Sequence, residues 1–148
     1  MKWFLKRFCD LTQPELYGIL QLRNAVFIVE QTCPYPDIDG HDIESYHLFL
    51  EDNQNKICAC CRILDKGQTF PEASIGRFVV RKDKRNGGLA RQMLQKAITF
   101  IDQQMDEHVI KIEAQAYLKN FYMEMGFTPC SDRFLDDGIP HIEMIRRA

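Results

Sequence analysis

The stretch RNGGLARQML, residues 85–94, places two adjacent glycines between a charged run and apolar residues at helical spacing. Backbone N–H groups at a helix start lack intrahelical partners and attract anions, and glycines let a phosphate approach them closely. Residues 81–91 hold five basic side chains and one acid, which gives a local charge of +4. The stretch therefore indicates a phosphate-binding loop, and a solvated basic turn is the alternative.

The kind of phosphate ligand follows from what the loop lacks and from what it matches. It has no GK[ST] ending and no full GxGxxG after a first strand, which argues against a P-loop and a dinucleotide site. Arg85, Gly88 and Ala90 match the signature [QR]xxGx[GA], so the chain resembles the GNAT superfamily of N-acetyltransferases. The segments RNAVFIVEQTCPYPDIDGHD and LDDGIPHIEM are similar to its ElaA-like branch.

The resemblance implies a mixed α/β fold with a central, largely antiparallel sheet flanked by helices, and it covers nearly the whole chain as one domain, residues 1–148. It also implies that the signature cradles the pyrophosphate of acetyl-coenzyme A, while the backbone of FVV pairs with the pantetheine arm. Many members have glycine directly after the arginine; Asn86 stands there in this chain, and asparagine tolerates positive φ better than most residues. The residues expected to bind acetyl-coenzyme A are Phe78, Val79, Val80, Arg85, Asn86, Gly87, Gly88, Leu89, Ala90 and Asn120.

Transfer of an acetyl group from a thioester to an amine needs a polarised carbonyl, a deprotonated amine and a protonated leaving thiolate. Backbone N–H groups of FVV can polarise the carbonyl as oxyanion donors. The resemblance implies that Tyr122, in KNFYMEMGF, is the general acid, since a phenol with a pKa of about 10 can donate to a developing thiolate. The alternative makes Tyr122 a core aromatic beside Phe121 and Phe127.

The general base is left open by the sequence. Some members carry a glutamate on the strand before the cradle, but this chain reads SIGR there. Glu30, His41, Glu113 and His141 are the candidates, and we expect Glu30 and His141 on the acceptor side. Residues 30–52 hold seven acids and no lysine or arginine, which favours a cationic amine acceptor. A solvated acidic surface is the alternative for that segment.

Several sequence patterns predict the elements that must position these residues. Strands are expected over 2–8, 47–51, 57–64, 74–80 and 109–116, with shorter pieces over 127–130 and 141–147. Helices are expected from the cap at Thr12 to about Glu30, over 89–105, and over 118–125 before Gly126. Residues 33–42 are predicted as an irregular loop, and 135–140 as a turn.

Composition excludes other classes. The 148 residues carry a net charge of −2, which argues against general nucleic-acid or membrane-surface binding, and no apolar run suits a bilayer span or a signal peptide, so we expect a cytoplasmic protein. The cysteines of CACC are expected to be buried on a strand, and neither they nor DIDGHD has the spacing of a metal site.

The predicted function is N-acetyl transfer from acetyl-coenzyme A to an amine by direct attack. A non-catalytic acyl-coenzyme A sensor is the alternative, and a cysteine-based redox protein is a third possibility.

Overall fold

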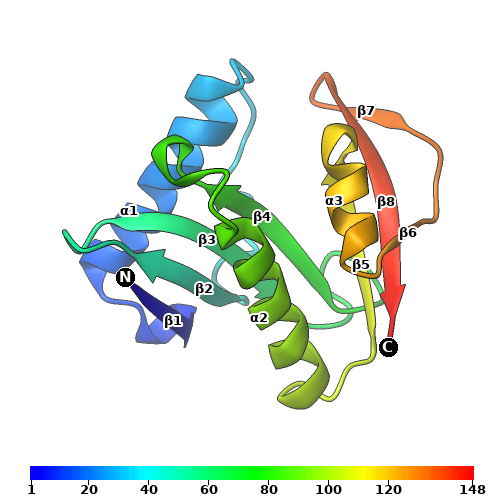
Figure 1. Cartoon of the computed structure of the whole chain (residues 1–148), viewed down its shortest axis with the longest axis horizontal. Coiled ribbons are helices and arrows are strands. Elements are labelled where there is room, and N and C mark those ends of the chain that lie inside the picture. Colours follow the sequence, from blue (N-terminus) through cyan, green and yellow to red (C-terminus); the bar gives the residue numbers. More distant parts are fainter.

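The computed structural model describes residues 1–148 as a mixed α/β fold (Figure 1). One sheet pairs four antiparallel strands in the order β1-β2-β3-β4, and a second sheet has the order β5-β8-β6, with β7 paired to β8. The strands are β1 (Lys2–Arg7), β2 (Tyr46–Glu51), β3 (Ile57–Leu64), β4 (Ser74–Val80), β5 (Val109–Gln115), β6 (Thr128–Pro129), β7 (Phe134–Asp136) and β8 (Ile139–Arg147). The helices are α1 (Gln13–Arg23), α2 (Leu89–Gln103) and α3 (Lys119–Glu124), with a π-helix η2 (Asn24–Glu30) and 3-10 turns η1 (Phe8–Asp10), η3 (Lys82–Lys84) and η4 (Ala116–Leu118).

The two sheets meet only at the starts of β4 and β5. A single parallel bridge joins Ala73 to Ile110, and the Lys111 N–H donates to the Ala73 carbonyl at 2.9 Å. Beyond that bridge the two strands diverge, as the green and yellow strands in Figure 1 show. Because β4 pairs with β3 on its other side, its edge toward β5 keeps backbone groups without strand partners.

The first helix begins as its sequence indicates. The Thr12 hydroxyl accepts the Glu15 N–H at 3.2 Å, and the Glu15 carboxylate accepts the Thr12 N–H at 2.8 Å, which is the capping box. The helix continues to Glu30, as predicted, but its last seven residues have π-helical hydrogen bonding. A π-helix turns the chain differently from an α-helix and often marks a functional site.

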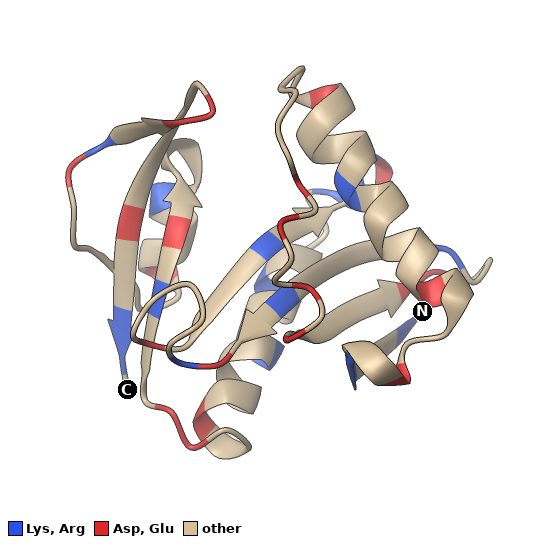
Figure 2. Cartoon of the chain, turned by 180° about the vertical axis from the view of Figure 1, so that it is seen from behind, with Lys and Arg blue, Asp and Glu red and all other residues tan.

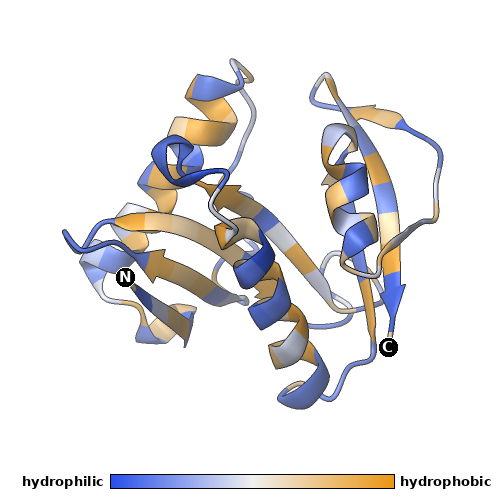
Figure 3. Cartoon of the chain, in the orientation of Figure 1, coloured by the Kyte–Doolittle hydropathy of each residue, from blue (hydrophilic) through white to orange (hydrophobic).

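The core lies on both faces of the first sheet. On one face, α2 buries an apolar stripe that includes Met93, Leu94 and Ile101, as its helical spacing predicts. On the other face, α1 and η2 pack Ile19, Leu22 and other apolar side chains against the sheet. Figure 3 shows hydrophobic residues concentrated on the central strands β2 and β3.

The fold class is confirmed, and most element boundaries agree with the sequence patterns within two residues. All of β3 is buried, so the prediction that the cysteines of CACC are small buried strand residues is confirmed; they form no disulfide. The turn predicted over 135–140 is present at Asp137 and Gly138, but it is shorter than predicted, because the residues on either side belong to the paired strands β7 and β8. No helix is both long enough and apolar enough to cross a bilayer.

Candidate active site

A cavity of about 590 Å³ occupies the space where β4 and β5 diverge. It runs from the start of α2, past both strands, to the hairpin formed by β7 and β8. Its lining contains nearly all the site residues that the sequence predicts: Phe78, Val79, Val80, Arg85, Asn86, Gly88, Leu89, Ala90, Tyr122, Glu30 and His141. Two predicted cofactor residues lie elsewhere: Gly87 lines an adjoining surface pocket, and Asn120 is exposed outside the cavity lining.

The cradle end of the cavity is built by the turn before α2. Asn86 and Gly88 both have positive φ, +67° and +85°. Gly88 is the N-cap of α2, and no side chain caps the helix there. A Cβ added at Gly87 or at Gly88 would meet nothing within 4 Å. The first N–H groups of a 15-residue helix therefore face open space, an arrangement that suits a pyrophosphate.

Arg85 is held in place by two neighbours. Its Nε donates to the Val80 carbonyl at 2.9 Å, and its two terminal nitrogens donate to the Glu30 carboxylate at 2.6 and 3.0 Å. The hydrogen bond from Arg85 lowers the pKa of Glu30. Glu30, expected on the acceptor side, is thus bound to the cradle arginine and ionised, which makes it a weak proton acceptor.

The middle of the cavity exposes the free edge of β4. Phe78, Val79 and Val80 line it, and no residue of β5 pairs with them. Arg77, just before them, has φ +47°, and the register with β3 shifts between Cys60 and Arg62. This bulge bends β4 away from β5. The unpaired N–H groups are therefore available to an extended ligand and to a developing oxyanion.

Tyr122 closes the middle of the cavity from α3. Its ring packs edge-on against Phe78, Phe121 and Phe127, with centroid distances of 6.2, 5.2 and 5.7 Å. No protein group hydrogen-bonds to its hydroxyl, although the side chain is 94% buried and lines the cavity. Burial raises the pKa of Tyr122, so the phenol keeps its proton. The ring is thus a core aromatic, and the hydroxyl remains free to donate.

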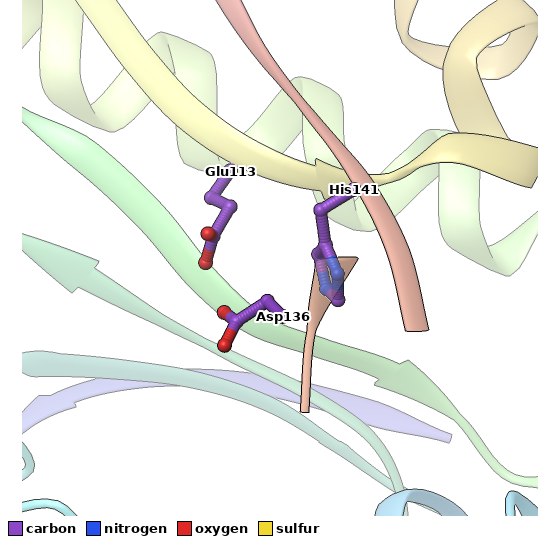
Figure 4. Close-up of side chains that lie close together, drawn as sticks. All are labelled: Glu113, Asp136 and His141. Atoms are coloured by element: carbon purple, nitrogen blue, oxygen red, sulfur yellow. The ribbon is translucent and has the colours of Figure 1, made fainter. Parts of the chain in front are cut away.

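A cluster of three polar side chains occupies the end of the cavity at the hairpin of β7 and β8, where we expected the acceptor (Figure 4). Glu113 comes from β5, Asp136 from β7 and His141 from β8, and their donor and acceptor atoms lie within 4.8 Å of one another. Figure 4 shows the two carboxyl groups facing each other. Neither carboxylate has a basic side chain within 4.0 Å. Glu113 is exposed to the cavity, but partial loss of solvent around its carboxyl group, and then a hydrogen bond with Asp136, raise its pKa to about 7.

The hydrogen bond of His141 fixes its tautomer. Its Nδ1 lies 2.7 Å from the Ile139 carbonyl, which can only accept, so Nδ1 carries a hydrogen and the Nε2 lone pair is free in the neutral ring. The ring also stacks on Phe134, with centroids 6.2 Å apart. One imidazole and two carboxylates can exchange protons with a ligand, and they are also donors that a divalent cation accepts.

The prediction that the acidic residues of segment 30–52 favour a cationic amine is wrong for the three aspartates of its loop, because arginines bind them. Arg23, almost fully buried, binds Asp37 at 2.9 Å and Asp42 at 2.7 Å. Arg62 binds Asp39 at 2.6 Å, and Arg77 from β4 binds Asp37 and Asp39. Figure 2 shows the acidic loop residues beside basic residues of the neighbouring helix and strands. None of the three aspartates lines the cavity. Each forms an ion pair with an arginine from elsewhere in the sequence.

This ion-pair network has a positioning role. It fixes the loop between η2 and β2, so that Cys33 and Tyr35 line the cavity. Two contacts tie the start of the loop to the second sheet: Gln31 and Gln115 exchange amide hydrogen bonds at 3.1 and 3.2 Å, and the Cys33 thiol donates to the Asp137 carbonyl at 3.2 Å. The cavity is therefore bounded by segments from both halves of the chain.

Two residues of the cluster differ in how far the sequence could reveal them. Glu113 alternates with the buried Ile112 and Ala114 along β5, so the sequence indicates an outward-facing carboxylate there. Asp136 lies in a segment with the composition of a turn, and no pattern separates it from Asp137. His41, another base candidate, lies outside the cavity lining, with its Nδ1 4.0 Å from Glu44.

Comparison with known proteins finds relatives that match almost the whole chain. Residues 22–148 match the family model described as "Acetyltransferase (GNAT) domain". Protein ElaA of Escherichia coli is 36% identical over 148 residues, which cover 99% of this chain and 96% of that protein. A UPF0039 protein of Schizosaccharomyces pombe is 37% identical over 145 residues, 97% of this chain and 95% of that protein.

Solved structures show the same architecture. An acyl-CoA N-acyltransferase from Pseudomonas aeruginosa superposes with a TM-score of 0.92 at 36% identity, covering 99% of each chain. Crystalline E. coli ElaA superposes with a TM-score of 0.89 at 36% identity, covering 99% of this chain and all of that one.

Proposed function

The chain belongs to the GNAT acetyltransferase family and is an acyltransferase, and we propose that it transfers an acetyl group from acetyl-coenzyme A to an amine within a ternary complex. One observation carries the proposal. A single cavity joins an open helix N-terminus, an unpaired strand edge, a free phenol and a carboxylate–imidazole cluster. These are the groups that binding the cofactor, polarising a thioester, protonating a thiolate and deprotonating an amine require.

Backbone groups of the protein bind the cofactor. The N–H groups at the start of α2 bind the pyrophosphate, and Gly88 leaves room for it. The pantetheine arm pairs with the free edge of β4 as an added strand would. An N–H from the segment Phe78–Val80 then donates to the thioester oxygen, where negative charge develops during attack.

Three proton transfers accompany the reaction. The ammonium gives a proton to the cluster around Glu113, and the neutral amine attacks the thioester carbonyl, forming a C–N bond. When the tetrahedral intermediate collapses, the C–S bond breaks and the sulfur keeps the electron pair. Tyr122 donates its hydroxyl proton to that sulfur. As the amide forms, the attacking nitrogen loses its second proton, which returns through solvent to the Tyr122 phenolate and restores the phenol.

The charge at the acceptor end favours a cationic amine. Glu113, Asp136 and Asp137 all line this end of the cavity, and none forms an ion pair with a lysine or arginine. Uncompensated carboxylates in a cavity raise the local concentration of cations. This cluster replaces the acidic loop as our basis for expecting a cationic acceptor.

The experiment is a turnover assay with acetyl-coenzyme A and a panel of amines: peptide N-termini, lysine, diamines, aromatic amines and neutral amines. We expect acetylation of at least one cationic amine, with loss of activity in Glu113→Gln. Cofactor binding is measured separately by thermal shift, with ATP and NAD as controls. A protein that binds acetyl-coenzyme A but acetylates no amine is the non-catalytic sensor, and one that binds ATP or NAD equally well contradicts the cradle.

A further inference from the structure

The carboxyl groups of Glu113 and Asp136 are brought together by chain segments that are distant in sequence. Glu113 is in the middle of β5, opposite Glu143 of β8, while Asp136 reaches the same place because β7 folds back on β8. The facing carboxyl groups open into the acceptor end of the cavity. We propose that Glu113 and Asp136 act as one proton acceptor, which takes a single proton from the amine and shares it between the two carboxyl groups.

The surroundings of the pair explain why it would act as a unit. The charged and titratable groups around it are Glu143 and His141 from β8 and Arg77 from β4. Asp137, in the turn between β7 and β8, lines the same end of the cavity. Arg77 favours the ionised form of Glu113, but its guanidinium is already bound to Asp37 and Asp39. Glu143 adds negative charge and is itself bound to Lys111 at 3.4 Å. Two facing carboxylates without a cation of their own hold one proton more tightly than either would alone.

Within the pair, Glu113 receives the proton from the amine, and Asp136 is a positioning residue that acts through Glu113 by sharing that proton. A lone glutamate with its ordinary pKa, about 4.3, is a poor acceptor for an ammonium proton. Loss of solvent is the largest cause that raises the pKa of Glu113 to about 7, and the hydrogen bond with Asp136 and the like charge of Asp136 act in the same direction. The pair would be the general base that the sequence left open.

His141 offers a path from the pair to solvent. Its free Nε2 can accept the shared proton and form an imidazolium, because Nδ1 already carries a hydrogen. The imidazolium then releases one proton to water. One ammonium proton thus leaves for solvent in each turnover, and the pair returns to its doubly ionised form.

The proposal deepens the proposed function and rests on it, so the first measurement does not depend on turnover. The side-chain carboxyl groups of the full chain are labelled with ¹³C and titrated by NMR, with EDTA present to remove divalent cations. We expect one carboxyl transition near neutral pH in the wild type and in Asp137→Asn, a control that removes a neighbouring cavity carboxylate outside the pair. It should be absent from Glu113→Gln and move to lower pH in Asp136→Asn. If all carboxyl groups titrate below about pH 5, the shared proton is refuted.

The second measurement is the pH profile of kcat/KM with the best amine. Activity should rise with pH as the pair loses its shared proton. In Asp136→Asn this rise should move to lower pH by at least about one unit. The plateau value of kcat/KM at high pH should also be smaller, since the remaining carboxylate is a weaker base. Asp132→Asn, a change at an exposed carboxylate outside the cavity lining, should keep the wild-type profile. An unmoved profile in Asp136→Asn overturns the proposal, because a purely structural role would change the rate at all pH values alike.

Failure of the proposed function and failure of the shared-proton proposal give different results. If the neutral-pH transition is present and no amine is acetylated, the proposed function fails, and with it the role of the pair as acceptor of the amine proton. If amines are acetylated and the transition is absent, the proposed function stands and the shared proton is refuted. For His141→Ala, recovery of part of the rate on adding imidazole would support the path to solvent, and no recovery would remove His141 from it.

Discussion

Replacing Tyr122 by phenylalanine separates the two roles that this side chain combines. The change keeps the ring that packs against Phe78, Phe121 and Phe127, and it removes only the hydroxyl. Because no protein group hydrogen-bonds to that hydroxyl, its loss leaves no buried partner unsatisfied. We therefore expect the free energy of unfolding to change by no more than about 0.5 kcal/mol.

The kinetic effect should be much larger. A general acid contributes about 10²- to 10⁴-fold to the rate, which corresponds to roughly 2.7–5.4 kcal/mol of barrier at about 1.36 kcal/mol per factor of ten. The raised pKa of Tyr122 keeps the phenol protonated across the neutral range, so its donor form is fully populated. Because the proton moves in the transition state, kcat and kcat/KM should fall together.

The assay is steady-state kinetics, with the affinity for acetyl-coenzyme A measured by calorimetry. Tyr117→Phe is the matched control, because Tyr117 also lines the cavity but is 74% exposed on the 3-10 turn η4. We expect Tyr117→Phe to retain wild-type kcat. A kcat for Tyr122→Phe within about threefold of the wild type, well below the general-acid range, would refute the assignment. A loss of cofactor binding without a change in kcat would make Tyr122 a binding residue.

Three further predictions test the cradle, the ion-pair network and acid stability. Gly88→Glu should abolish the thermal stabilisation by acetyl-coenzyme A, whereas Gly67→Glu, which has the same φ of +85° and open surroundings in a remote loop, should keep it; equal stabilisation in both would contradict the cradle. Arg23→Met should cost about 3–5 kcal/mol in urea unfolding, because it leaves Asp37 and Asp42 buried without their cation; a loss below about 1 kcal/mol would show that the network is unimportant. Burial raises the pKa values of Asp39 and Asp42, but hydrogen bonds from arginines outweigh it, so both pKa values are lowered. The two aspartates should therefore contribute fully to the free energy of unfolding above about pH 4, and this contribution should be lost as pH falls below it. A urea midpoint that is the same at pH 4 and pH 3 would contradict this account.

Local patterns predicted most elements because each depends on neighbours in the chain. The stripe of α2, the buried run of β3 and the capping box at Thr12 are all visible in short windows of sequence. The turn before α2 could be predicted for the same reason, because the turn and the start of the helix lie within one segment, residues 85–90. Its glycine and asparagine adopt the positive φ that their residue types allow.

The acidic segment shows where such windows fail. Residues 30–52 contain no lysine or arginine, but Arg23, Arg62 and Arg77 reach them from α1, β3 and β4. Charge counted along the chain cannot include partners that the fold supplies. The segment is accordingly a clamped loop rather than a surface for a cation, and the uncompensated acids lie elsewhere, on β5 and in the hairpin of β7 and β8.

The divergence of β4 and β5 links these separate features. If the two strands had paired along their whole length, the edge of β4 would have no free N–H groups, and β5 would hold Glu113 against it instead of across a cavity. The same divergence leaves space for the hairpin to bring Asp136 and His141 opposite Glu113. A single interrupted strand pairing therefore leaves both the free N–H groups that we propose as donors to the thioester oxygen and the space that we propose for the amine. The bulge at Arg77, where φ is +47°, marks where β4 begins to bend away.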